Sequence, residues 1–400
     1  MIRSYAYSFF ALIPFVLMST GQAGAAKIAG LQQMYDGTML PDVAVSSFSH
    51  TEQLLPVRVV HRGGSARALR LRAKVFPKIQ FMDHGRSFDL YDYLAANRVA
   101  GLLVLKDGEI AFEDYELGIG PESHWASFSM AKSVASTLVG AALVDGLICS
   151  IDDPVVRYVP VLQGSAYDGV SIRQLLAMSS GVRWDETYTD PKSDRRKMLE
   201  LQVNGKPGDL LRYMASLPRV APPGTVWNYS TGETFVIGAV LEGAIHRPLS
   251  EYLSQKIWSP AGMEHDATWW TDGPNGMVWA GSGIGATLRD YGRFGLIAAD
   301  NGRIDGRSIV PEGWFDAAGA PQDIGGKTVA YGYMWWIPPQ TDPVHVGAFQ
   351  AQGIFGQYIY INPRERLVIV VLSARSKPGH AARFDLDDDA FFCAVATALH

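Results

Sequence analysis

The most constraining feature of this chain is that its two strand-rich regions lie far apart in the sequence. Residues 99–115 hold two β-rich runs joined by an Asp-Gly dipeptide, which is typical of a tight hairpin turn. Residues 356–374 repeat this strand–turn–strand arrangement near the other end of the chain, and 343–351 suggest one more strand. The region between them, about 150–320, is punctuated by prolines and predicts helices with long loops. We therefore expect a discontinuous α/β (α+β) domain, in which strands from both ends form the sheet and a helical region is inserted.

Helical patterns flank and fill this inserted region. Ser127 is the expected N-cap of a largely buried helix that ends at Gly146. The charged run 192–197 is expected to lie on a solvated loop or helix face. Further helices are expected at 170–178, 208–216, 233–245, 248–257 and 387–399.

Composition excludes several classes of protein. Hydrophobic residues make up 48% of the chain and charged residues 19%, which is globular rather than disordered. The formal net charge of -5 offers no basic surface to nucleic acid. Two cysteines, Cys149 and Cys393, are too few for a disulfide scaffold or a thiolate metal cluster, and they either pair or remain as buried thiols. The nine histidines are scattered, so a metal site is not indicated.

The N-terminus has the pattern of an export signal. Arg3 precedes an apolar run at 9–18, and the run is followed by small residues suited to cleavage after Ala25. The run is shorter than the ~20 residues of a membrane span, although a short membrane anchor is the alternative. We expect a signal peptide over 1–25, no stable membrane insertion, and a mature protein that is periplasmic or secreted. Residues 26–94 are expected to form an N-terminal extension that packs on the body.

The first motif with chemical content is Ser129-Met-Ala-Lys132, in the predicted buried helix. Residues three apart on a helix share a face, so the two side chains can meet. A serine hydroxyl needs a base to become a nucleophile, and a lysine serves as a base only when burial lowers its pKa. The start of a helix also favours negative charge, which suits an oxyanion. A surface lysine beside a serine that lines the helix is the alternative interpretation.

Two further motifs follow. Tyr229 lies after a Pro/Gly-rich turn and just before a predicted helix, and its phenol could move a proton to a leaving group. An ordinary half-buried tyrosine is the alternative. The glycines of 351–357 enter the late strand pair, where they indicate either a close backbone approach to a ligand or a β-bulge.

Taken together, these motifs resemble the serine β-lactamase and penicillin-binding-protein superfamily, in its class C and esterase branch. Within that branch the chain is most similar to the 6-aminohexanoate-dimer (nylon-oligomer) hydrolases. The resemblance covers roughly residues 95–400 and rests on SMAKS at 129–133, TYTDP at 187–191, YSTGET at 229–234, YGYMWW at 331–336 and GIFGQYIYINP at 353–363. It implies a β-lactamase/transpeptidase-like fold, with a mainly antiparallel sheet, flanking helices and the inserted helical region.

The resemblance also implies roles for individual residues. Ser129 matches the acylated nucleophile, Lys132 its base, and Tyr229 the proton relay to the leaving group. The backbone N–H groups of Ser129 and Ile354 match the oxyanion hole, and Tyr188 matches a tyrosine that contacts the substrate. The implied chemistry is hydrolysis of a small ester or amide through an acyl-enzyme, without metal or cofactor.

Two departures from the superfamily narrow this expectation. Ala351 stands where β-lactamases and peptidases carry the lysine of K-T-G, and Thr231 stands where Y-x-N supplies an amide. Both changes favour an esterase or a linear-amide hydrolase over a D-Ala-D-Ala carboxypeptidase or β-lactamase. A non-catalytic binding protein on the same fold is the remaining alternative. The pattern does not indicate the natural substrate or the oligomeric state.

Overall fold

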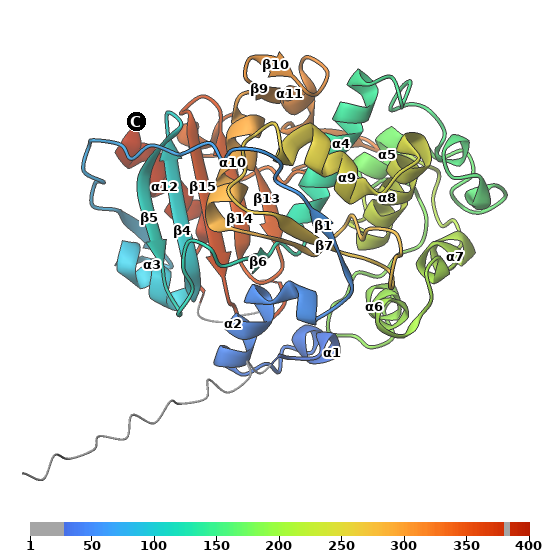
Figure 1. Cartoon of the computed structure of the whole chain (residues 1–400), viewed down its shortest axis with the longest axis horizontal. Helices are drawn as coiled ribbons and strands as arrows, with labels where there is room; N and C mark the ends of the chain where they lie inside the picture. Colours follow the sequence, from blue (N-terminus) through green and yellow to red (C-terminus); the bar gives the residue numbers. More distant parts are fainter. Residues whose placement is uncertain (1–27, 380–384) are drawn as a thin grey trace, which may run out of the picture.

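The computed structural model describes residues 28–379 and 385–400, so the predicted signal peptide at 1–25 lies outside the described residues. The centre of the fold is a five-stranded antiparallel sheet in the order β13-β14-β15-β4-β5 (Figure 1). Both predicted hairpins are present, and β15 pairs with β4, which joins the two ends of the chain. The strands are β4 (Val99–Lys106), β5 (Glu109–Tyr115), β13 (Phe349–Gly353), β14 (Gln357–Asn362) and β15 (Leu367–Ser373).

Helices cover both faces of this sheet, because successive strand residues point to opposite sides. In β4, Leu103 and Leu105 pack in the cluster that includes α4 (Met130–Val144) and α10 (Leu288–Ala299). The intervening Leu102 and Val104 belong to the cluster on the other face. That second cluster is completed by α3 (Leu90–Ala96) and the C-terminal helix α12 (Asp388–Leu399).

The region between the strands is mostly helical, with a second, four-stranded sheet in the order β1-β7-β8-β6 at its border. The helix expected at 248–257 ends earlier as α9 and continues as a π-helical turn. The helices are α5 (Ile172–Leu176), α6 (Asp194–Asn204), α7 (Asp209–Ser216), α8 (Thr231–Ile245), α9 (Leu249–Leu253) and α11 (Trp314–Ala318), with the π turn at Ser254–Trp258 and 3-10 turns at Val155–Arg157, Pro160–Leu162 and Pro343–His345. The second sheet comprises β1 (Val57–Val60), β6 (Trp125–Ala126), β7 (Ala267–Trp270) and β8 (Ile284–Ala286).

Three small hairpins complete the fold. They are β2 (Gln80–Asp83) with β3 (Arg86–Asp89), β9 (Arg303–Ile304) with β10 (Arg307–Ser308), and β11 (Gln322–Ile324) with β12 (Lys327–Val329).

Two sequence expectations are wrong in detail. The helix expected to have its N-cap at Ser127 has it at Ser129 and begins at Met130, because Phe128 adopts a left-handed conformation (φ 44°) that helical geometry does not allow. The charged run 192–197 is not simply solvated, since Arg195 in α6 is only 1% exposed. Its partners come from distant segments that a local charge pattern does not reveal.

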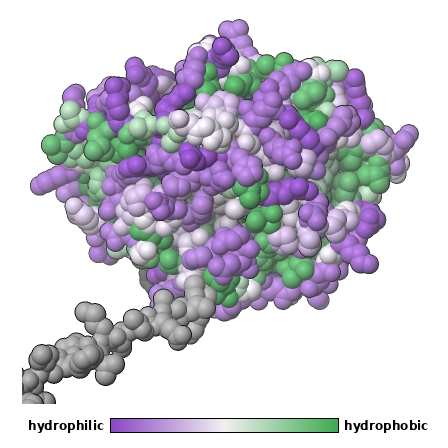
Figure 2. All heavy atoms as spheres, in the orientation of Figure 1, coloured by the Kyte–Doolittle hydropathy of each residue, from purple (hydrophilic) through white to green (hydrophobic). Residues whose placement is uncertain are grey.

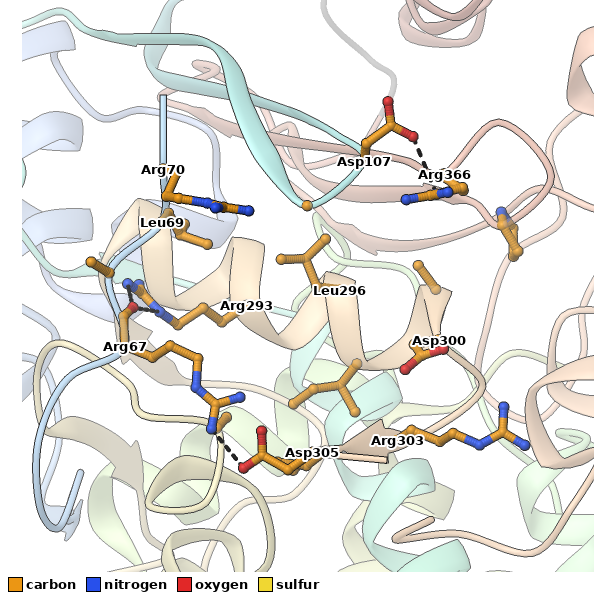
Figure 3. A pocket seen from close by; sticks show the side chains of 17 residues that line it. Arg67, Leu69, Arg70, Asp107, Arg293, Leu296, Asp300, Arg303, Asp305 and Arg366 are labelled. Carbon is orange, nitrogen blue, oxygen red and sulfur yellow. Dashed lines mark hydrogen bonds and ion pairs between the residues drawn. The ribbon is translucent and has the colours of Figure 1, made fainter. Parts of the chain in front are cut away.

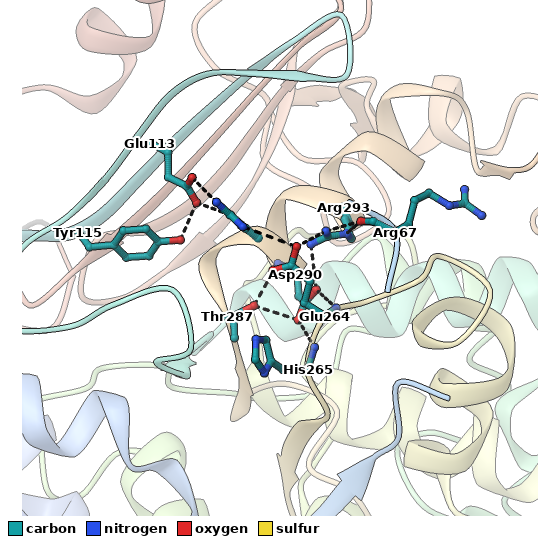
Figure 4. Close-up of polar contacts among 9 residues, drawn as sticks. Arg67, Glu113, Tyr115, Glu264, His265, Thr287, Asp290 and Arg293 are labelled. Carbon is teal, nitrogen blue, oxygen red and sulfur yellow. Dashed lines mark hydrogen bonds and ion pairs between the residues drawn. The ribbon is translucent and has the colours of Figure 1, made fainter. Parts of the chain in front are cut away.

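A polar network fastens α10 to its surroundings (Figure 4). Arg293 donates to Glu264 and to the backbone oxygen of Arg67, each at 2.5 Å, and thereby holds an N-terminal segment against α10. Arg289 donates to both carboxylate oxygens of Glu113 in β5, at 2.6 and 2.7 Å. Fork-shaped pairs of this kind are geometrically specific, so they set the position of α10 against the central sheet.

The N-terminal extension is also built into the core. It contains α1 (Leu31–Tyr35), α2 (Pro41–Ser49) and a 3-10 turn at Thr51–Gln53. Phe48 of α2 is fully buried, and its ring lies 5.0 Å from the rings of both Phe128 and Phe355, centroid to centroid. Aromatic contacts at this spacing stabilise packing beyond the area that they bury.

The outer surface is mainly polar, and on the face in Figure 2 the hydrophobic side chains form small separate groups. Among the described residues, no helix is long and apolar enough to cross a membrane. The two cysteines are unpaired, with Cys149 exposed and Cys393 partly buried, so the expectation of two buried thiols is wrong for Cys149.

Replacing Phe48 with alanine should lower the free energy of unfolding by about 3–5 kcal/mol, because it removes a buried ring and leaves a cavity. Urea denaturation of the two proteins measures this difference. Leu40→Ala is the matched control, since Leu40 lies in the same extension but is 68% exposed. Equal stabilities for Phe48→Ala and Leu40→Ala would contradict the packing.

Candidate active site

Ser129 lies in a tight turn at the start of α4. Phe128 enters that turn with a positive φ, and Ser129 is the N-cap of the helix, although its hydroxyl forms no capping bond. A non-glycine residue in the left-handed region is strained and persists where the surrounding packing holds it, as the ring of Phe48 does here. Ser129, which follows this strained residue, is partly exposed.

Lys132 lies one helical turn further on and is 1% exposed. Its Nζ lies 2.9 Å from Ser129 Oγ, 3.1 Å from Thr231 Oγ1 and 2.9 Å from the backbone oxygen of Gly281. A neutral amine has two N–H donors and one lone pair. Donation to Thr231 and Gly281 leaves the lone pair to accept the hydroxyl proton of Ser129.

Burial lowers the pKa of Lys132 from 10.5 to about 7, because desolvation penalises the ammonium form. The Glu186 carboxylate acts in the opposite direction and raises this pKa, whereas the Arg195 guanidinium lowers it further. A substantial fraction of Lys132 is therefore neutral at pH 7, which is the form that can act as a base.

Tyr229 completes the polar cluster. It directly precedes Ser230, the N-cap of α8, whose hydroxyl accepts from Glu233 N. The ammonium nitrogen of Lys132 lies 5.1 Å from the centre of the Tyr229 ring. Burial raises the pKa of the Tyr229 phenol, Glu186 raises it further, and the contact with Ser129 lowers it. The phenol is accordingly protonated at neutral pH and can act as an acid.

Two more groups belong to this cluster: Glu186, which was not singled out from the sequence, and Thr231, which was named there only as a departure from the superfamily. Thr231 Oγ1 accepts from Lys132 and donates to Glu186 Oε1 at 2.5 Å. Glu186 Oε2 also accepts from the Thr231 backbone N–H at 2.8 Å and from Trp184 Nε1 at 2.5 Å. From the sequence, the lack of an amide at position 231 indicated a lost contact to the substrate. In the structure, the Thr231 hydroxyl instead links Lys132 to the Glu186 carboxylate.

Arg195 lies behind Glu186. Its Nε is 3.8 Å from Glu186 Oε1, and its guanidinium lies 4.4 Å from the ring centre of Tyr35 and 5.0 Å from that of Trp279. Arg195 also donates a hydrogen bond to the Tyr35 hydroxyl. The neighbouring Arg196 pairs with Asp36 at 2.7 Å, so helix α1 of the extension is fastened beside the site.

The two residues expected to form an oxyanion hole lie on neighbouring turns. The Phe128 and Phe355 rings, one residue from Ser129 and Ile354, are 4.8 Å apart. A Cβ at Gly353 would lie 2.8 Å from the backbone oxygen of Ser127, so only glycine permits this approach. Among the described residues, neither the Ser129 nor the Ile354 N–H donates a backbone hydrogen bond to another residue.

Aromatic side chains surround the partly exposed Tyr229. Its ring lies 5.3 Å from that of Trp336 and 6.0 Å from that of Tyr331. Tyr188 packs against Tyr35 at 6.0 Å, and Tyr229 is among the groups that raise the pKa of the Tyr188 phenol. Tyr188 therefore lies beside the cluster formed by Ser129, Lys132 and Tyr229.

A separate cavity of about 730 Å³ lies over the outer side of α10 (Figure 3), and the Ser129 cluster does not line it. Its arginines are largely paired with acidic residues. Arg67 lies 2.7 Å from Asp305, and Arg366 lies 3.1 Å from Asp107. These pairs satisfy the charges locally, and the cavity contributes nothing to the chemistry at Ser129.

Helix α8 carries one more buried acid, Glu233. Ser180 donates a hydrogen bond to it, and no residue among those described partners its second carboxylate oxygen. Burial raises the pKa of Glu233 to about 8. The neutral carboxylic acid is thus the form that the folded protein favours at pH 7.

The antiparallel sheet, the buried lysine beside a helix-start serine and the adjacent tyrosine define a serine hydrolase. The family model described as Beta-lactamase matches residues 91–392, and the chain belongs to that family. The fold is accordingly the β-lactamase/transpeptidase-like arrangement that the sequence resemblance implied.

Individual relatives agree with this assignment. The chain is 31% identical to the 6-aminohexanoate-dimer hydrolase of Paenarthrobacter ureafaciens over 305 residues, which is 72% of this chain and 76% of that protein. A Bacillus anthracis structure provisionally described as a 6-aminohexanoate-dimer hydrolase superposes with a TM-score of 0.76 at 22% identity, covering 89% of this chain and 92% of that one. EstCE1, a hydrolase with promiscuous acyltransferase activity, superposes with a TM-score of 0.61 at 14% identity, covering 77% and 96%.

The buried Glu233 predicts a pH-dependent stability. Its pKa is about 8 in the folded protein against 4.5 in an exposed carboxyl, so the unfolded chain loses this proton first as pH rises. The contribution of Glu233 is thus complete below about pH 4 and falls by about 1.4 kcal/mol per pH unit until pH 8. Urea denaturation of wild type and Glu233→Gln at pH 5, 6, 7 and 8 should show the variant gaining stability relative to wild type with increasing pH. Parallel stability curves would contradict the shifted pKa.

Proposed function

We propose that this protein is an exported hydrolase of carboxylic esters or small linear amides that works through an acyl-enzyme on Ser129. The observation that carries the proposal is the geometry at Lys132, whose amine is buried, has two hydrogen-bond acceptors besides Ser129, and lies 2.9 Å from Ser129 Oγ. A lysine so arranged supplies the base that a serine nucleophile needs.

In the first step Ser129 Oγ attacks the carbonyl carbon while its proton passes to the lone pair of Lys132. The carbonyl oxygen becomes an oxyanion, and the proposed donors to it are the N–H groups of Ser129 and Ile354. In support, neither N–H forms a backbone hydrogen bond among the described residues. The positive end of α4 favours the same negative charge.

Collapse of the tetrahedral intermediate then requires a proton on the leaving group. Tyr229 is suited to donate it, because its raised pKa keeps the phenol protonated, and Lys132 in its ammonium form can replace the proton. The leaving alcohol or amine departs and the acyl group remains on Ser129. Water then attacks the acyl carbonyl and gives a proton to Lys132. As the ester bond to Ser129 breaks, Lys132 returns that proton to Ser129 Oγ, which releases the acid and restores the neutral amine.

Esters and linear amides are favoured over β-lactams for a local reason. Ala351, where a K-T-G lysine would stand, is fully buried in β13 and offers no cation to a substrate carboxylate. The rings of Tyr188, Trp336 and Tyr331 suit an apolar or extended substrate beside Tyr229. The name of the Paenarthrobacter ureafaciens relative, a 6-aminohexanoate-dimer hydrolase, supports a linear amide as one substrate.

Export and domain organisation are part of the proposal. A cleaved signal peptide over 1–25 would leave residues 26–94 as the extension that carries α1 and α2, ahead of the catalytic part at 95–400. The intact mass of the protein from a periplasmic or culture fraction tests this. A mass that includes residues 1–25 would contradict cleavage.

Ser129→Ala should abolish hydrolysis, which is tested by initial rates on a short p-nitrophenyl ester, a 6-aminohexanoate dimer, a D-Ala-D-Ala peptide and a chromogenic cephalosporin. We expect turnover of the ester or the dimer that disappears in the variant. Turnover of the peptide or the cephalosporin that depends on Ser129 would instead indicate a cell-wall carboxypeptidase or a β-lactamase. Activity that survives in Ser129→Ala would remove this serine from the mechanism.

Lys132→Ala should lower kcat by at least about 10²-fold with a smaller effect on KM, because base catalysis acts in the transition state. Steady-state kinetics on the active substrate measure both constants. Lys106→Ala is a matched control, since Lys106 at the end of β4 is also buried but pairs with Glu365 in the turn between β14 and β15. An unchanged kcat in Lys132→Ala would exclude this lysine as the base.

A further inference from the structure

Glu186 lies two hydrogen bonds from the base of the proposed reaction. Thr231 Oγ1 connects the two residues, because it accepts from Lys132 at 3.1 Å and donates to Glu186 at 2.5 Å. The carboxylate also receives the backbone N–H of Thr231 and the indole N–H of Trp184. These donors orient the carboxylate toward the lysine.

Arg195 is the counter-charge on the far side of the carboxylate. Its side chain is 2% exposed, and its Nε is 3.8 Å from Glu186 Oε1. Among the described residues, Nε and Nη1 have no hydrogen-bond partner, so their compensation is the charge of Glu186 and the faces of Tyr35 and Trp279. Buried charges require such pairing, since an isolated one would cost several kcal/mol.

Together these residues form a charge array that consists of Lys132, Thr231, Glu186 and Arg195. In it the Glu186 carboxylate lies between two basic side chains, and the Thr231 hydroxyl bridges it to Lys132. We propose that Glu186 is a positioning residue that stabilises the Lys132 ammonium formed when Ser129 loses its proton, and that Arg195 limits this effect by sharing the carboxylate. This inference rests on the proposed acyl-enzyme chemistry. It deepens that proposal by assigning the residues that balance the two protonation states of the base.

The balance has a physical reason. Too little negative charge near Lys132 makes the amine a weak proton acceptor, whereas too much keeps it as an ammonium that cannot accept the Ser129 proton. Glu186 acts on Lys132 through the Thr231 hydroxyl. The positive charge of Arg195 offsets part of the electrostatic effect of the Glu186 carboxylate on the lysine. The phenols of Tyr35, Tyr188 and Tyr229 surround the array, but burial raises the pKa of each, so they remain neutral.

The array also gives the N-terminal extension a place in the site. Tyr35 of α1 accepts a hydrogen bond from Arg195 and covers its guanidinium. Asp36 pairs with Arg196 in the same helix α6. A segment 96 to 97 positions before Lys132 in the chain thus fixes Arg195, the outermost charge that acts on the lysine.

The proposal predicts opposite effects for two neutralising substitutions. Glu186→Gln removes the group that raises the Lys132 pKa, whereas Arg195→Gln removes a group that lowers it. The rate at which a fluorophosphonate probe labels Ser129 should increase with pH as Lys132 deprotonates. In Glu186→Gln the midpoint of that increase should move about one pH unit lower, with a plateau reduced about tenfold. In Arg195→Gln the midpoint should move higher.

The bridging hydroxyl is tested separately. Thr231→Ser keeps the hydroxyl and should preserve the coupling between Lys132 and Glu186, whereas Thr231→Val should remove it. Adding Glu186→Gln to Thr231→Val should then reduce the labelling rate less than it does in wild type. Asp185→Asn is the matched control, because it neutralises the adjacent carboxylate, which accepts from Thr187 N and has no contact with Lys132. Melting temperatures check that each variant is folded.

The outcomes separate the two proposals. A midpoint that is unmoved in Glu186→Gln, or that moves in the same direction in both charge variants, would overturn the array while leaving the hydrolase intact. Opposite midpoint shifts without turnover of any test substrate would support the array and overturn the proposed substrates. If the probe does not label Ser129 at all, both proposals fail.

Discussion

The burial of one amine governs the architecture of this site. Lys132 is removed from water, and desolvation brings its pKa to about 7. Such burial is possible only if other segments meet its hydrogen-bonding needs, since an unpaired buried polar group is costly. Helix α8 supplies Thr231, the loop before β8 supplies the oxygen of Gly281, and α4 itself supplies Ser129. The helical region and the four-stranded sheet therefore have to converge on α4.

The N-terminal extension packs against the segments that meet at α4, through Phe48 and Tyr35. Phe48 packs against Phe128 and Phe355, which are the neighbours of Ser129 and Ile354, the two residues proposed for the oxyanion hole. Tyr35 covers Arg195, which in turn pairs with Glu186. The extension thus shapes the site without supplying any of the reacting atoms. A change in it would act on the geometry of the turn and on the local charge.

Much of the architecture was predictable because local patterns specify it. The Asp-Gly hairpin, the terminal strand pair and helix α8 were expected from alternation, turn residues and helix signals, and each is present. The start of α4 was misplaced by two residues, because the strain at Phe128 depends on packing against Phe48. The run around Arg195 was expected to be solvated, since its sequence shows the charges but not the partners that cover them.

Sequence by itself determined the family, the shared helical face of Ser129 and Lys132, and the two hairpins and several helices of the main fold. These follow from spacings of a few residues, and short-range geometry makes such spacings readable. Only the tertiary structure decided which distant groups act on Lys132, namely Thr231, Glu186 and Arg195. The physical reason is that a charge acts through space over several ångströms and in proportion to its burial, whereas the chain places these residues tens of positions apart.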